Sequence, residues 1–199
     1  MKVYVDFDRT LFDCDKFLGD LYTLVNKYNI TKEIFKECQN QCKRKGFNPY
    51  LILDLVKEKM DFDDKLYDDV KKLMSQTKRY LYHDTIPFLD NLKKLNYEVV
   101  ILTKGNSVYQ KEKIFNAKLD YLYSKLIVTM KHKGELKIDY QNGIFIDDNP
   151  KEILSILTKN PKIIIRVRRD NTKYSDDLLN DNILTVESLE EIIEKDLLS

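Results

Sequence analysis

The sequence predicts an α/β protein, with a doubly wound and mostly parallel sheet whose first strand is followed by an inserted block of helices. Two observations support this fold class. After residue 83, short β-rich runs alternate with helical patterns, which is typical of right-handed crossovers and a parallel sheet covered on both faces. Between residues 15 and 82, the apolar residues recur at helical spacing and no convincing strand is found.

The elements follow from these two patterns. Asp84 and Thr85 can cap a helix that has Pro87 in its first turn and runs to about residue 95. The expected strands are 2–7, 98–102, 125–130, 144–146, 162–167 and 183–186. The other expected helices are about four in 15–82, then 107–117, 150–157 and 187–198.

Composition and charge exclude several classes of protein. The chain has 199 residues, 43% of them hydrophobic, which is enough for one domain, or one with an insertion, around a real core. A net charge of +1 gives no general field for nucleic acid or an anionic membrane, and the cluster Arg166, Arg168 and Arg169 is interpreted as a solvated surface patch. No apolar run is long enough to span a bilayer and no signal peptide is recognised, so we expect a cytoplasmic protein, either monomer or homodimer.

Acidic residues stand where two of the expected strands end. Ligands of such sheets bind beyond the carboxyl ends of the strands, so these residues are the first candidates for a site. Asp6 and Asp8 end the first strand and point to one side, because strand side chains alternate. Asp147 and Asp148 end a later strand and come close if that strand neighbours the first. Carboxylates gathered in this way repel unless a cation binds them, and an all-oxygen site of this kind suits Mg²⁺.

A third strand end offers groups that bind an anion. Thr103 supplies a hydroxyl, and the turn Gly105-Asn106 into a helix supplies backbone N–H groups. Together with the carboxylates and a nearby lysine, this set fits phosphoryl transfer through an aspartyl phosphate.

Three segments in chain order resemble the motifs of the haloacid dehalogenase (HAD) superfamily. D-F-D-R-T-L resembles the first motif, V-I-L-T-K-G-N the second and F-I-D-D-N-P the fourth. The resemblance covers residues 1–12 and about 84–160. It implies a HAD-like Rossmann-type core made of residues 1–14 and 83–199, with a helical C1-type cap at 15–82.

The resemblance also implies a function and roles for its residues. The function is that of a Mg²⁺-dependent phosphohydrolase that cleaves a small phosphate monoester, of the nucleotide or sugar phosphate class, through an aspartyl phosphate. Asp6 would be the nucleophile, and Asp8 the general acid and base that also lends its backbone carbonyl to Mg²⁺. Asp6, Asp147 and Asp148 would be the carboxylate ligands, and Thr103 would hold a phosphoryl oxygen. Family members that cleave carbon–halogen bonds lack the second Asp, so Asp8 favours phosphate chemistry.

Three positions depart from the family pattern or leave a choice open. Lys133, in K-G-E-L, resembles the lysine-glycine variant of the third motif, but Lys131 and Lys137 compete for this role. Arg9 stands where Gly is frequent, and Lys104 where Asn or Asp is frequent. Either Arg9 or Lys104 could add positive charge near a substrate phosphate, so both join Thr103, Gly105 and Asn106 as candidate substrate-binding residues.

Two other functions are compatible with part of the pattern. A phosphoacceptor signalling module also places an acidic pair, a Thr and a Lys at strand ends, but its phosphorylated Asp stands apart from the acidic pair and it has no lid after the first strand. A HAD-like protein that binds a nucleotide without turnover is the other alternative. The residues Asp6, Asp8, Thr103 and Asp147 are all present, which argues against that reading.

Overall fold

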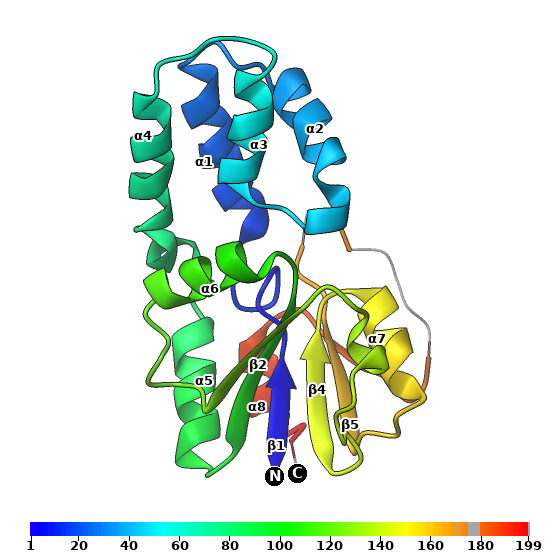
Figure 1. Ribbon diagram of the computed structural model, residues 1–199. Coiled ribbons are helices and arrows are strands. Elements are labelled where there is room, and N and C mark those ends of the chain that lie inside the picture. The colour runs from blue at the N-terminus through cyan, green and yellow to red at the C-terminus, as the bar shows by residue number, and fades with distance from the viewer. Residues whose placement is uncertain (171, 175–179, 199) are drawn as a thin grey trace. The chain divides into compact units, whose positions relative to one another are not determined.

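The computed structural model describes residues 1–170, 172–174 and 180–198 (Figure 1). The chain forms two compact units. One unit consists of Met1–Asp13, Leu81–Lys104 and Leu119–Ser199 and contains the sheet. The other consists of Cys14–Tyr80 and Gly105–Lys118 and is helical.

The sheet is parallel throughout its described strands. In chain order these are β1 (Lys2–Val5), β2 (Glu98–Lys104), β3 (Lys125–Thr129), β4 (Gly143–Asp147), β5 (Ile163–Val167) and β6 (Leu184–Val186). Their order in the sheet is β3-β2-β1-β4-β5-β6, and every neighbouring pair is parallel. The doubly wound α/β fold predicted from the alternating pattern is therefore confirmed.

Both faces of the sheet are buried. Tyr4 and Phe145 lie in one apolar cluster with Ile153 and Ile156 of α7 (Pro150–Leu157). Val3 and Val5 point to the opposite face, because strand side chains alternate, and they too are fully buried. In the same unit α5 (Thr85–Lys94) packs on β2 and on α8 (Leu189–Glu194). These apolar layers hold the strand ends in fixed positions.

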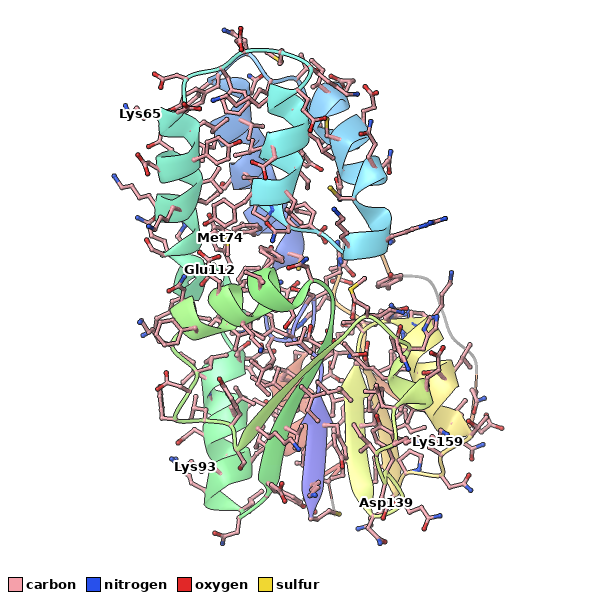
Figure 2. The ribbon with its side chains drawn as sticks, in the orientation of Figure 1. Lys65, Met74, Lys93, Glu112, Asp139 and Lys159 are labelled. Atoms are coloured by element: carbon pink, nitrogen blue, oxygen red, sulfur yellow. The ribbon has the colours of Figure 1, made fainter. Side chains whose placement is uncertain are left out.

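The helical unit contains the four α-helices predicted for residues 15–82. They are α1 (Cys14–Asn26), α2 (Lys32–Gln41), α3 (Pro49–Lys57) and α4 (Lys65–Met74), with the 3-10 turns η1 (Lys43–Lys45) and η2 (Thr77–Tyr80). Figure 2 labels Lys65 and Met74 at the two ends of α4. The residues of α4 at helical spacing, Leu66, Val70, Leu73 and Met74, are buried. None of the described helices is long and apolar enough to cross a membrane.

Helix α6 (Ser107–Asn116) groups with these helices, although it lies between β2 and β3 in the chain. Its Glu112 accepts a hydrogen bond from the Tyr50 hydroxyl at 3.0 Å, and the Lys113 carbonyl accepts one from the Thr77 hydroxyl at 2.8 Å. The helical unit is thus larger than the predicted insertion of residues 15–82.

Asp84 is the N-cap residue of α5, as predicted, but its side chain makes no capping hydrogen bond, because its carboxylate accepts hydrogen bonds from Arg169 and from the N–H of Leu189 instead. The predicted surface patch of arginines is wrong, since Arg166 is 0% exposed and Arg169 is 7% exposed.

Candidate active site

The topology of the sheet brings the predicted strand ends together. β1 lies between β2 and β4 and pairs with both, so Val5 has Ile101 on one side and Ile146 on the other. Asp6 follows β1 directly, and its N–H donates to the Ile146 carbonyl at 2.9 Å. Asp147, the last residue of β4, therefore lies beside Asp6 at the carboxyl edge of the sheet.

Three carboxylates form a buried acidic cluster. Oxygens of Asp6, Asp147 and Asp148 all lie within 4.8 Å of one another, and the three residues are 6%, 1% and 4% exposed. Burial raises the pKa of Asp6 to about 7, against the lowering effect of Lys133, and the neighbouring Asp147 and Asp8 raise it further. Burial, followed by the charges of Asp147 and Asp6, raises the pKa of Asp148 well above its ordinary value.

The acidic cluster fits a hard divalent cation. Its donors are all carboxylate oxygens, which Mg²⁺ prefers. Asp148 Oδ2 is buried and accepts no hydrogen bond from the described residues, so this oxygen can serve as a metal ligand. Asp8 is not one of the three clustered side chains, and the metal-binding role expected for it uses its backbone carbonyl.

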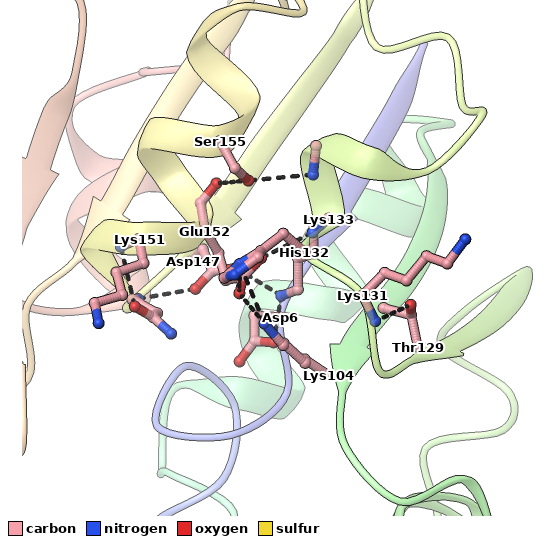
Figure 3. A network of polar contacts seen from close by, with 12 residues as sticks. Asp6, Lys104, Thr129, Lys131, His132, Lys133, Asp147, Lys151, Glu152 and Ser155 are labelled. Atoms are coloured by element: carbon pink, nitrogen blue, oxygen red, sulfur yellow. Dashed lines mark hydrogen bonds and ion pairs between the residues drawn. The ribbon is translucent and has the colours of Figure 1, made fainter. Parts of the chain in front are cut away.

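Lys133 is the lysine that the structure brings to the acidic cluster. Its Nζ lies 2.5 Å from Asp6 Oδ1 and 2.6 Å from Asp147 Oδ2 (Figure 3), whereas Lys131 and Lys137 are exposed. Burial lowers the pKa of Lys133, but the charges and hydrogen bonds of the two carboxylates outweigh burial, so the pKa is raised. Lys133 is therefore a fixed positive charge between the proposed nucleophile and a proposed metal ligand.

The loop after β1 carries the other predicted residues of the first motif. The N–H of Arg9 donates to the Phe12 carbonyl at 2.7 Å, which closes a tight turn directly after Asp8. Arg9 has a φ of 63°, the left-handed conformation that glycine adopts without strain. The charge of Arg9 lowers the pKa of Asp148, so its guanidinium acts on the acidic cluster electrostatically.

Thr103 and Lys104 end β2 in different environments. Thr103 is fully buried, and its hydroxyl oxygen has no hydrogen-bond partner among the described residues. Buried polar groups in proteins almost always have a partner, so this hydroxyl is available to donate to a bound anion. Lys104 Nζ donates to Glu152 Oε1 at 2.9 Å, so this predicted substrate-binding group is part of an ion pair.

Gly105 and Asn106 belong to the helical unit. Gly105 has a φ of 157°, a conformation that favours glycine. The Asn106 side chain accepts from the Tyr109 N–H at 3.2 Å and from Asn48 at 3.3 Å, and it donates to the Lys45 carbonyl at 2.9 Å. These bonds give the Asn106 side chain a structural role as the N-cap of α6.

Sequence reasoning missed two buried residues around the site. Glu152 lies in the first turn of α7 and contacts the backbone of Lys133, and Arg169 contacts the backbone of the loop after β1 through the Thr10 carbonyl. The pattern Asn149-x-x-Glu152 did carry a signal, but it is the signal of an ordinary helix cap. For Arg169 the local sequence carries no signal, because its partner Asp84 is remote in the chain.

Solved structures share this fold along the whole chain. A protein from Burkholderia xenovorans described as a haloacid dehalogenase-like hydrolase matches with a TM-score of 0.76 and 18% identity, over 98% of this chain and 95% of that chain. The HAD-type hydrolase YfnB of Bacillus subtilis, in a structure with bound magnesium, matches with a TM-score of 0.66 and 16% identity, over 98% and 97%. L-2-haloacid dehalogenase of Xanthobacter autotrophicus, with chloropropionic acid covalently bound, matches with a TM-score of 0.67 and 13% identity, over 97% and 96%.

These likenesses define the fold. No protein-family model and no curated protein sequence matches the chain. The sequences of these solved structures are less than one fifth identical to this chain, so the likeness concerns the fold. The chain has the haloacid dehalogenase-like fold, as the three motifs predicted.

Proposed function

We propose that the protein is a Mg²⁺-dependent phosphohydrolase that cleaves small phosphate monoesters, of the nucleotide or sugar phosphate class, through an aspartyl phosphate. One observation carries this proposal: the Asp6 carboxylate lies in a buried cluster with Asp147, Asp148 and the ammonium of Lys133. Such a cluster offers a nucleophile, a cation site and a fixed positive charge at one edge of the sheet.

The proposed reaction has two steps. A carboxylate oxygen of Asp6 attacks phosphorus, the ester P–O bond breaks, and Asp8 gives a proton to the leaving oxygen. Asp8 then takes a proton from water, the water oxygen attacks phosphorus, and the bond from phosphorus to Asp6 breaks to release phosphate. Lys133 and the Thr103 hydroxyl would stabilise the negative charge on the transferring group.

Asp6, Asp147 and Asp148 would hold Mg²⁺ through their side chains, and Asp8 through its backbone carbonyl. When bound, the cation would neutralise the repulsion among the carboxylates and the charge of the phosphate. YfnB, which shares the fold, has bound magnesium in its structure, and this supports the choice of metal.

Dehalogenation is the main competing chemistry, since one protein of the same fold is a haloacid dehalogenase. Asp8 favours phosphate, because a leaving alkoxide needs a proton from a general acid whereas a leaving halide does not. The inserted helices at 15–82 are proposed to act as a cap, which would favour small substrates over folded phosphoproteins.

The test uses purified protein and p-nitrophenyl phosphate. We expect hydrolysis with Mg²⁺, loss of activity with EDTA, and no turnover by Asp6→Asn. An active Asp6→Asn protein would contradict the role of Asp6 as nucleophile. A phosphoenzyme that persists well beyond seconds would favour the signalling module, and binding of nucleotide without release of phosphate would favour the protein without turnover.

A further inference from the structure

One buried carboxylate organises the surroundings of Lys133. Glu152 is 2% exposed, and its Oε2 accepts the backbone N–H of Lys133 at 2.8 Å. Its Oε1 lies 2.9 Å from Lys104 Nζ and 2.8 Å from His132 Nδ1 (Figure 3). His132 Nδ1 also lies 3.1 Å from Lys104 Nζ, so the three side chains form one polar cluster. Glu152 thus joins α7 to the end of β2 and to the segment before β4.

The start of α7 leaves Glu152 available for these contacts. Asn149 is the N-cap, and Glu152 stands three residues later, where the acid of a capping box accepts the N–H of the N-cap residue. In this protein Asp147 Oδ1 accepts that N–H instead, at 2.8 Å. The Glu152 carboxylate is therefore free to reach across to Lys133.

Lys133 begins a short turn that is held by contacts outside itself. The turn is η3 (Lys133–Glu135), and His132 before it makes no side-chain capping bond. The Tyr140 hydroxyl donates to the Lys133 carbonyl at 2.9 Å, and the Gly134 N–H donates to Ser155 Oγ at 3.1 Å. A Cβ at Gly134 would lie 2.0 Å from the Ser155 carbonyl oxygen, so glycine is needed for this close approach to α7. The turn is thus attached to α7 on one side.

This attachment matters because the lysine side chain is flexible. Between β3 and β4 the described chain has η3 and no α-helix of its own to carry Lys133. A lysine has a four-carbon stem, so the place of its Nζ depends on where its backbone is fixed. The Lys133 N–H donates to Glu152 and the Lys133 carbonyl accepts from Tyr140, so the Lys133 backbone is fixed at both groups.

We propose that Glu152 is a positioning residue for phosphoryl transfer, because it holds the Lys133 turn on α7 so that Lys133 Nζ bridges Asp6 and Asp147. The inference rests on the proposed function. The ion pair with Lys104 offsets the charge of Glu152, which would otherwise add a further negative charge beside the acidic cluster. Within the described residues Glu152 makes a hydrogen bond to neither of the two carboxylates, so its effect on the position of Lys133 Nζ passes through the backbone of the Lys133 turn.

The activity test compares three variants of the full chain. In Glu152→Leu the acceptor is lost, and we expect kcat for p-nitrophenyl phosphate to fall about ten- to a hundredfold with little change in KM. Glu152→Gln keeps an oxygen that can accept the Lys133 N–H, and should recover most of the lost kcat. Glu190→Leu is the matched control, because Glu190 also lies in the first turn of a helix but its side chain is 52% exposed.

A second measurement does not depend on activity. Amide hydrogen exchange followed by NMR should show faster exchange at Lys133 in Glu152→Leu than in the wild type. The amides of β4 should keep their protection, whereas a general loss of structure would also expose β4. Should Glu152→Leu fail to fold, Glu152→Asp shortens the side chain by one methylene and should produce the same selective change in exchange.

Two results would overturn the inference. One is a Lys133 amide whose exchange is unchanged in Glu152→Leu. The other is faster exchange at Lys133 with kcat as in the wild type, because the turn would then not need to be held. A wild-type protein inactive on every phosphate ester would instead count against the proposed function, and the exchange measurement would still decide whether Glu152 holds Lys133.

Discussion

The guanidinium of Arg169 donates hydrogen bonds of 2.7 and 2.8 Å to the two carboxylate oxygens of Asp84, and both residues are buried. Arg169 also donates to the Thr10 carbonyl at 3.0 Å, and Asp84 accepts the N–H of Leu189 at 2.8 Å. One buried ion pair thus ties the loop after β1 to the starts of α5 and α8.

Replacing Arg169 should be strongly destabilising. Arg169→Met leaves the Asp84 charge buried without its partner, and we expect a loss of about 3–5 kcal/mol in the free energy of unfolding, measured with urea. Arg168→Met is the control, because its guanidinium is 30% exposed and its pairing with Glu187 at 3.3 Å contributes about 0–1 kcal/mol. Equal losses in the two variants would contradict the importance of the buried pair.

Thr103→Val should change stability and activity in opposite directions. The Thr103 hydroxyl is buried without a partner, so replacing it with a methyl group of similar shape should leave stability unchanged or increase it by about 1 kcal/mol. If the hydroxyl donates to a transferring phosphoryl oxygen, kcat should fall about 10²-fold. Thermal unfolding and steady-state kinetics on one preparation test both effects, and a parallel loss of both would point to a structural role alone.

Arg9→Gly should stabilise the fold and weaken substrate binding. Arg9 has a φ of 63°, where a side chain costs about 1–2 kcal/mol that glycine avoids, although glycine loses more entropy on folding. Lys118→Gly is the matched control, because Lys118 has a φ of 59° and directly follows the C-cap of α6. We expect a small rise in melting temperature for both variants and a rise in KM for Arg9→Gly alone. An unchanged KM would remove Arg9 from the candidate substrate-binding residues.

The Asp148→Asn variant should be more stable than the wild type without Mg²⁺, and it should lose this advantage when Mg²⁺ is added. Without metal the variant removes a buried charge that other carboxylates repel, so its melting temperature should exceed that of the wild type. In the wild type, Mg²⁺ at about 100 times its Kd should add about 2.7 kcal/mol, and the variant should gain much less. Thermal unfolding in EDTA and in MgCl₂ measures both effects, and equal gains from Mg²⁺ would exclude Asp148 as a ligand.

Strand ends could be predicted because the rules that place them are local. Alternation of side chains and the handedness of crossovers were enough to bring Asp6 and Asp147 to one edge of the sheet. The choice among Lys131, Lys133 and Lys137 stayed open, because a three-residue turn has no periodicity that the sequence could reveal. Burial between two carboxylates distinguishes Lys133, and burial there is a property of the tertiary structure.

The roles of Glu152 and Arg169 could not be predicted for a related reason. Arg169 was predicted to face water and no role was predicted for Glu152, because a local pattern gives a charged residue no partner that is remote in the chain. The remote partners are the Lys133 turn for Glu152 and Asp84 for Arg169. A remote partner also explains why the Asp84 side chain does not cap α5.

The place of β1 in the sheet has a consequence for biosynthesis. Lys2 pairs with Glu98 on one side and with Gly143 on the other, so during synthesis β1 must wait for both of its neighbours. The helices of residues 14–80 belong to the other compact unit and can form meanwhile, because contacts at short sequence separation cost less chain entropy than long-range ones. We therefore expect nascent chains that end before residue 98 to hold folded helices together with an unpaired apolar strand, a state that is prone to aggregation.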